Sequence, residues 1–219
     1  IDERREHAFA HSVGAARSMP ATRYFEHLDL FARSRMALVG YYSLLPEIEP
    51  DLPEIFRQIA DTGCKIALDA AFGGGGMKPL DRVLPHLDVY FPSLAEAVHQ
   101  TGHEDPRRAV VEYREAGARR MVGVKLGEQG ALVSPVPGEF VSVDACAPPG
   151  TVVDTVGAGD AFFGGLITGL VRGCSPENAA RLGAAAGACC VTGAGAAEGL
   201  RDLEFTAGLA DIDVPHSSE

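Results

Sequence analysis

The sequence has few basic residues, no long apolar run and no paired cysteine motif, and each absence excludes a class of protein. Lysine and arginine number 19 against 30 aspartate and glutamate residues, which gives a net charge of −11. A chain this acidic binds nucleic acid or an anionic membrane poorly, because both interactions depend on neutralising phosphate. No apolar run reaches the roughly 18 residues that a membrane helix needs. We therefore expect neither nucleic acid nor a membrane as a partner.

The five cysteines, Cys64, Cys146, Cys174, Cys189 and Cys190, include no CxxC pair. An odd number with two adjacent members suits neither a zinc ribbon nor an ordinary disulfide framework. No secretory signal peptide opens the sequence. These features predict buried, reduced thiols and a cytoplasmic protein.

The 219 residues are 46% apolar and 22% charged, which is ordinary for a soluble domain with one sizeable core. Strand-like and helix-like stretches alternate at short spacing, which predicts βαβ units. We expect a three-layer α/β/α sandwich with a mostly parallel sheet, whose ligands bind at the carboxyl ends of the strands. The expected strands are 36–42, 64–70, 88–91, 120–126, 130–135 and 139–143; the expected helices are 52–62, 80–87, 94–100, 106–116, 158–171, 176–191 and 203–209.

Several common catalytic motifs are absent. The glycine run at 73–76 is not a P-loop, because Lys78 follows Met77 and is followed by Pro79 where a P-loop has Ser or Thr. The motifs GxGxxG, HExxH and GxSxG are also missing, and none of the seven histidines pairs with a histidine or cysteine at metal-ligand spacing.

Residues 154–160 read DTVGAGD, between a strand-like valine pair at 152–153 and a long apolar helix. Small residues at such a turn leave backbone N–H groups unpaired at the positive end of the helix dipole, which makes an anion hole. The hole would consist of Gly157, Ala158 and Gly159. Asp160, in the first helical turn, is suited to accept the proton of a hydroxyl group that attacks a phosphoryl group. The alternative is an ordinary helix acid beside a tight turn.

Residues 154–170, DTVGAGDAFFGGLITGL, resemble the C-terminal signature of the ribokinase-like, or PfkB, carbohydrate kinases. Residues 88–97, DVYFPSLAEA, resemble the strand of this family that precedes Asn-x-x-Glu. Residues 122–133, VGVKLGEQGALV, resemble its Gly-x-x-Gly turn and hairpin near the nucleotide, and residues 8–16, AFAHSVGAA, the segment that returns from the lid. The resemblance covers the chain from about Arg4 onward. It implies an ATP-dependent kinase that phosphorylates a hydroxyl group of a small sugar or sugar-like substrate.

The resemblance also implies a role for individual residues. Asp160 would be the catalytic base, and residues 157–159 the anion hole. The acceptor substrate would lie against Asp154, Gly157 and Asp160. The nucleotide would contact Ser93, Lys125, Gly127 and Gly130.

The implied cofactors are ATP, Mg²⁺ and K⁺. Glu96 would organise Mg²⁺ through water. Asp154 and the carbonyl group of Val156 would bind the monovalent cation, with the loop 193–197 completing that site.

Three positions depart from the pattern of the family. Ser93 replaces the Asn of Asn-x-x-Glu, and Lys125 stands where Thr or Ser is common. The lysine would either add a phosphate contact or extend its ammonium group toward solvent. Ala184 occupies a position where an Asn often meets the nucleotide. The catalytic part of the signature is unchanged.

Members of the family carry a substantial N-terminal stretch before the point that matches residue 1. We therefore expect the sequence to be N-terminally incomplete, with the lid only partly present. Residues 1–20 would be a remnant of the lid or substrate side, and residues 21–219 the kinase core. A homodimer formed through the lid is a further expectation from the resemblance.

Two alternative functions stay open. A nucleoside kinase uses the same signature, and more aromatic stacking residues near the substrate would favour it. A catalytically weak relative that binds sugar or nucleotide, as a sensor or scaffold, finds its support in Ser93 and Ala184, whereas the intact Asp160 argues against it.

Overall fold

The computed structural model describes residues 14–42, 45, 47–70 and 76–215, which alternate between strand and helix. The strands are β1 (Met36–Val39), β2 (Lys65–Leu68), β3 (Val89–Tyr90), β4 (Met121–Lys125), β5 (Ala131–Ser134) and β6 (Val141–Val143). The helices are α1 (Thr22–Phe25), α2 (Leu28–Ala32), α3 (Leu52–Asp61), α4 (Leu80–Val83), α5 (Leu94–Thr101), α6 (Pro106–Glu115), α7 (Ala158–Val171), α8 (Pro176–Cys190) and α9 (Leu203–Ala210). Most of segment 8–16 and of the glycine run at 73–76 lies outside the described residues.

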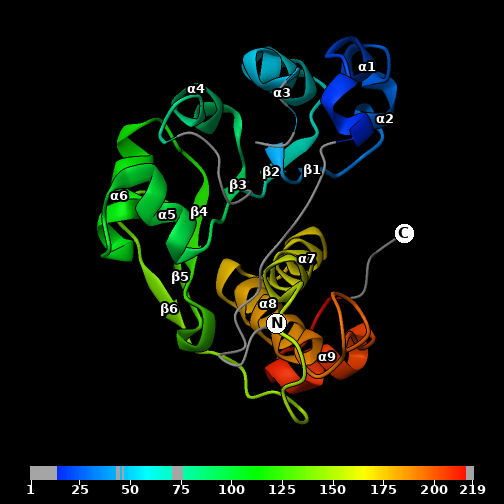
Figure 1. The fold of residues 1–219 in the computed structure, drawn as a ribbon, viewed down its shortest axis with the longest axis vertical. Helices are drawn as coiled ribbons and strands as arrows, with labels where there is room; N and C mark the ends of the chain where they lie inside the picture. The colour runs from blue at the N-terminus through cyan, green and yellow to red at the C-terminus, as the bar shows by residue number, and fades with distance from the viewer. Residues whose placement is uncertain (1–13, 43–44, 46, 71–75, 216–219) are drawn as a thin grey trace.

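The six strands form one sheet in the order β1-β2-β3-β4-β5-β6. The first four strands run parallel, and β5 and β6 continue the sheet antiparallel. The parallel part confirms the expected βαβ units, and the antiparallel part confirms the strand pair expected between 130 and 143. Helices α3 to α6 cover one face of the sheet, and α7 and α8 cover the other (Figure 1). The predicted three-layer α/β/α fold is therefore confirmed.

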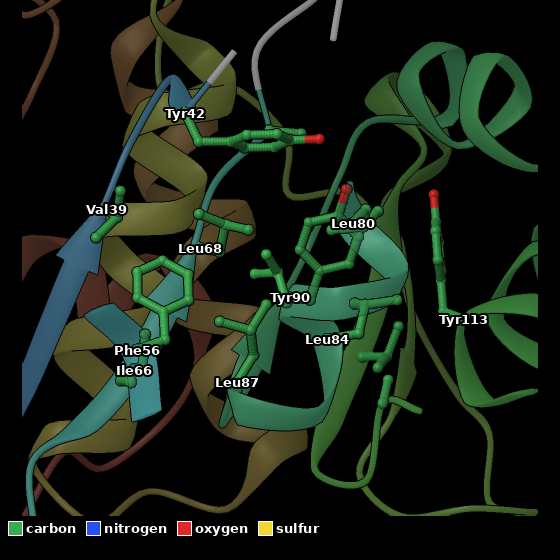
Figure 2. Close-up of a cluster of buried hydrophobic side chains, with 14 of the residues drawn as sticks. Val39, Tyr42, Phe56, Ile66, Leu68, Leu80, Leu84, Leu87, Tyr90 and Tyr113 are labelled. Carbon is green, nitrogen blue, oxygen red and sulfur yellow. The ribbon is translucent and has the colours of Figure 1, made fainter. Parts of the chain in front are cut away.

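Side chains along the central strands alternate between the two faces, as the pleat of a strand requires. In β2, Ile66 and Leu68 join the core beneath α3, whereas Ala67 joins the core beneath α7 and α8. Figure 2 shows the first of these cores, where Phe56 of α3 lies against β2. The sheet thus separates two apolar cores, and burial on both faces explains why its strands read as continuous apolar runs.

Three expected elements differ from the structure. Strand β1 ends at Val39 because Gly40 and Tyr41 turn the chain away from the sheet, with Tyr41 at φ 55°. The expected helix 80–87 divides into α4 and a short 3₁₀ helix, η4 (Leu84–His86), since Pro85 has no N–H group to continue the α-helical ladder. The valines at 152–153 are exposed and form no strand; the Val153 N–H group donates to the Val191 carbonyl at the end of α8.

All five cysteines are free thiols, as the sequence predicts. Cys64, Cys189 and Cys190 are buried, whereas Cys146 and Cys174 are partly exposed. Burial raises the pKa of all five thiols. In the part of the chain that the structure describes, no helix combines the length and apolarity needed to cross a membrane.

Helices α7 and α8 pack closely because glycines lie between them. A Cβ atom on Gly165 would come within 2.8 Å of the Leu182 carbonyl oxygen and 2.9 Å of the Gly183 Cα. Gly183 in turn would bring a Cβ atom within 2.6 Å of the Phe162 carbonyl oxygen. The next glycine of α7, Gly164, has no neighbour within 4 Å of the same point. The backbone contact therefore depends on particular glycines.

We predict opposite effects on stability for alanine at these two adjacent glycines. Gly165→Ala forces the two helices apart and should lower the free energy of unfolding by about 1–3 kcal/mol. Gly164→Ala faces open space and should raise it by about 0.5–1 kcal/mol through helix propensity alone. Chemical denaturation of both variants measures the difference, and equal effects would contradict the packing argument.

Candidate functional site

Helix α7 begins at a turn that only glycine can form. Gly157 is its N-cap and has φ 80°, in the left-handed region. A Cβ atom at this position would lie 2.6 Å from the Ala196 carbonyl oxygen. The close approach joins the turn before α7 to the loop 193–197 and fixes where the helix starts.

The first turn of α7 presents backbone donors and no side-chain cap. The Ala158 N–H group makes a long bond of 3.3 Å to the Thr155 carbonyl. The N–H groups of Gly159 and Asp160 have no intrahelical acceptor, as at every helix start, and the regular bonds begin with Ala161 N–H to the Gly157 carbonyl at 2.8 Å. Together with the helix dipole, they form a place where an anion is stabilised. The anion hole expected from Gly157, Ala158 and Gly159 stays a prediction.

Asp160 is exposed in this first turn, and its carboxylate accepts a hydrogen bond from Tyr41. The Tyr41 Oη atom lies 2.5 Å from Asp160 Oδ2. Burial raises the pKa of the Tyr41 phenol, and the bond to Asp160 raises it further, so the phenol stays protonated and donates. The hydroxyl of Tyr41 therefore occupies one acceptor position of the Asp160 carboxylate.

A buried ion pair joins the carboxyl ends of β2 and β4. Lys125 Nζ lies 3.1 Å from Asp69 Oδ1, with side-chain exposures of 13% and 9%. Burial raises the pKa of Asp69 to about 6, and the Lys125 ammonium group opposes this shift. The carboxylates of Glu96 and Asp160 add to the increase. Asp69 is thus ionised at neutral pH but close to its titration range.

Ser93 and Glu96 form a capping box at the start of α5. Glu96 Oε2 accepts from the Ser93 backbone N–H group at 2.7 Å and from its hydroxyl at 2.8 Å. Ser93 also pairs with Lys125 as a parallel bridge, which brings α5 next to the end of β4. The serine that departs from the family pattern therefore performs a local capping role.

A cavity of about 590 Å³ lies between the end of β4, the turn 127–130, the start of α7 with the loop before it, and the second half of α8. Lys125, Gly127, Gly130 and Ala184 line it, so these sequence-predicted positions are brought together. Ser93 and Glu96 do not line this cavity. The Lys125 ammonium group and Gly159 line it close to each other, and most of the remaining lining is apolar, including Ala184, Ala188 and Val191, with Glu128 and Thr155 as polar members. Such a cavity suits a ligand with a flat apolar part and an anionic end.

Asp160 itself lines a second cavity, of about 400 Å³, along α7 and α8. The first turn of α7 therefore separates the two hollows, with Gly159 on one and Asp160 on the other.

Asp154 holds together the two loops in which the monovalent cation was expected. Its Oδ1 atom accepts from the Val156 N–H group at 3.0 Å, and Oδ2 from the Gly195 N–H group at 2.9 Å. The Val156 and Ala196 carbonyl oxygens lie 3.6 and 3.2 Å from Cys190 Sγ, so both face one place. Carboxylate and carbonyl oxygens are the donors that a hard cation prefers, so these residues fit K⁺.

Comparison with known proteins shows the family of this chain. The model of the pfkB family carbohydrate kinases matches residues 2–203. The chain belongs to the pfkB family. The expected family resemblance is thereby confirmed.

Among similar pfkB proteins, the 2-dehydro-3-deoxygluconokinase of Bacillus subtilis is 38% identical over 117 residues, which are 53% of this chain and 35% of the relative. An uncharacterized sugar kinase of Archaeoglobus fulgidus is 34% identical over 178 residues, 80% of this chain and 69% of that protein. The structure of Arabidopsis thaliana ribokinase complexed with ribose and ATP superposes with a TM-score of 0.73 at 24% identity, covering 86% of this chain and 59% of that one. The chain thus spans about a third of the first relative and about three fifths of the ribokinase.

Sequence reasoning missed two residues of this candidate site, Tyr41 and Asp69. Each follows a parallel strand, β1 and β2, at the edge of the sheet where ligands bind. The signal available in the sequence was their position at the carboxyl end of the predicted strands 36–42 and 64–70. Their partners are 119 and 56 residues away in the chain, which the local pattern does not reveal.

We predict that Asp69 makes stability depend on pH between about 4 and 6. Its pKa is about 6 in the folded protein, against about 3.9 in an unfolded chain. In this interval the folded state keeps a proton that the unfolded state has lost, so the stabilisation is complete below pH 4 and is lost as the pH rises. The free energy of unfolding of the wild type, relative to Asp69→Asn, should fall by about 2–3 kcal/mol across the interval.

Urea denaturation of both proteins at a series of pH values tests this linkage. A difference between them that does not change with pH would contradict it.

Proposed function

We propose that this pfkB protein is an ATP-dependent kinase that phosphorylates a hydroxyl group of a small sugar or sugar-like substrate. The observation that carries the proposal is the first turn of α7. There an exposed carboxylate, Asp160, stands beside free backbone donors and next to a mostly apolar cavity that Lys125 and Gly159 line. A base, an anion site and a slot for a planar group are the parts that phosphoryl transfer from a nucleotide requires.

In the proposed reaction, the acceptor hydroxyl displaces Tyr41 and donates to Asp160. Its oxygen forms a bond to the γ-phosphorus of ATP while the bond from that phosphorus to the β,γ-bridging oxygen breaks. The hydroxyl proton goes to the Asp160 carboxylate, and ADP leaves. The backbone N–H groups of residues 157–159 stabilise charge on the transferring group.

The proposed nucleotide lies in the 590 Å³ cavity with its base toward Ala184, Ala188 and Val191. Alanine at 184 leaves an apolar wall, so the base is held by packing there instead of by a side-chain amide. When bound, Mg²⁺ would neutralise charge on the phosphates, and Glu96 is the proposed carboxylate that orients its water. Asp154 and the Val156 carbonyl are the proposed ligands of K⁺, which would fix the two loops next to the anion site.

The acceptor class rests on the relatives, which include a 2-dehydro-3-deoxygluconokinase and a sugar kinase. A 36% identical cytidine kinase of Thermococcus kodakarensis, matched over 105 residues that are 48% of this chain and 37% of that protein, keeps nucleosides as the second candidate class. The test panel therefore contains sugars, sugar acids and nucleosides. ADP release by the complete protein with ATP, Mg²⁺ and K⁺ identifies the acceptor.

Replacing Asp160 by Asn tests the proposed mechanism. The amide keeps the shape of the side chain but cannot take the proton, so kcat should fall by about 10²–10⁴ while ATP still binds. The exposed Asp213→Asn serves as the matched control and should keep wild-type turnover. Wild-type turnover in Asp160→Asn would refute the role of the base.

Replacing Tyr41 by Phe tests whether its hydroxyl competes with the acceptor. The variant keeps the ring and removes the donor to Asp160. A hydrogen bond to a charged group is worth about 1.5 kcal/mol, so KM for the acceptor should fall by about tenfold, with kcat little changed. Steady-state kinetics in the acceptor measure this, with Tyr24→Phe in α1 as the control. An unchanged or higher KM would contradict competition.

A further inference from the structure

The ion pair between Lys125 and Asp69 differs from the other ion pairs of the described residues. Its side chains are 13% and 9% exposed, whereas in each of the others both side chains are at least 38% exposed. Removing two charges from water costs free energy that their mutual attraction scarcely repays. A buried pair is therefore weak evidence for stability, and its position calls for a functional reason.

The Lys125 ammonium group lies over the start of α7. Its Nζ atom is 3.6 Å from the point that a Cβ atom on Gly159 would occupy. It is also 5.8 Å from the centroid of the Phe163 ring, one turn further along the helix. A cation beside a helix N-terminus has the unfavourable sign for the helix dipole. An anion placed between the Lys125 ammonium group and the start of α7 would attract both of them and so relieve this repulsion.

The pair also leaves the ammonium group free to act. A lysine has three N–H donors, and Asp69 accepts from one of them at 3.1 Å. The side chain lines the 590 Å³ cavity, so donors that Asp69 does not use are within reach of a ligand there. Asp69 is nearly fully buried at the end of β2, where its backbone N–H group donates to the Val39 carbonyl. The sheet thus fixes the position of the Asp69 carboxylate, and this carboxylate in turn fixes the position of the Lys125 ammonium group.

We propose that Lys125 is a catalytic residue that donates to the transferring phosphoryl group, and that Asp69 is the positioning residue that holds its ammonium group. The inference rests on the proposed function. The phosphoryl group lies between the Lys125 ammonium group and the N–H groups of α7 while the bond to the bridging oxygen breaks. Negative charge on its oxygens then meets donors from both sides. The lysine transfers no proton and keeps its charge throughout.

Lys125→Met tests the catalytic role because it keeps most of the aliphatic stem and removes the charge. Loss of one preorganised donor should lower kcat by about 10²–10³. The matched control is Lys65→Met, which removes an exposed lysine from the start of β2, at the other end of the sheet. Lys125→Arg keeps the charge and should retain more turnover than the Met variant. A kcat of Lys125→Met within threefold of the wild type would overturn the proposal.

Measurements of nucleotide affinity show whether Lys125 contacts the γ-phosphoryl group or another part of the nucleotide. Calorimetry compares ADP with a non-hydrolysable ATP analogue on wild type and Lys125→Met. The analogue should lose about tenfold in affinity, the order expected for one charge-assisted hydrogen bond, while ADP changes less than twofold. Equal losses for both nucleotides would mean that the lysine contacts the nucleotide outside the γ-phosphoryl group, and would overturn the proposal.

A double-variant cycle tests the positioning role of Asp69. Asp69→Asn should lower kcat at least tenfold in the wild type. In the Lys125→Met background the same substitution should change kcat less than threefold, because its effect passes through the lysine. A merely structural role would give the same loss in both backgrounds and would refute the assignment.

Two controls separate the possible failures. Circular dichroism and denaturation establish that each variant is folded, and Lys125→Gln replaces the Met variant if that one does not fold. Asp160→Asn is assayed in the same series. If it keeps turnover, the proposed function itself fails; if it loses turnover while Lys125→Met does not, only the inference about Lys125 fails.

Discussion

The close approach of Gly157 to the Ala196 carbonyl is the constraint on which the site depends. A side chain at 157 would meet that oxygen at 2.6 Å, and the backbone there is left-handed, so glycine alone fits. The two hydrogen bonds of Asp154 reinforce the same junction from the other side. Because the junction fixes where α7 begins, it also fixes where the free N–H groups of that helix point. The glycines between α7 and α8 then let the two helices pack closely together.

The parallel strands supply the other half of the site, because their carboxyl ends meet at one edge. Tyr41 follows β1, Asp69 follows β2, and Lys125 is the last residue of β4. Tyr41 and Lys125 face the start of α7. Tyr41 holds a left-handed backbone and Asp69 a buried charge, and both cost free energy. Neither is explained by the stability of the fold. Such costs concentrate where binding or chemistry requires them.

Helices and strands were predictable where the local sequence decides them, whereas contacts between residues distant in the chain were not. Helix α7 has the predicted bounds 158–171 because small residues open it at Gly157 and Gly173 follows its end. The valines at 152–153 carry strand propensity but lie where the chain meets the end of α8, so tertiary contact overrides propensity. The contacts of Tyr41 and Asp69 were not predicted because their partners, Asp160 and Lys125, are distant in the chain. Motif spacing finds residues within a loop, whereas a sheet edge collects residues from several loops.

An acidic chain can hold a phosphate group because the field that matters is local. The net charge of −11 repels an approaching anion at long range, so affinity has to come from contact. At the first turn of α7, backbone N–H groups and one ammonium group face the same space, at contact distance from an anion bound there. Before an anion binds, Asp69 balances the ammonium group; when it binds, the spare N–H donors of the lysine serve it without breaking that pair. No buried charge is left alone at either stage, which is why a lysine in this position requires a carboxylate behind it.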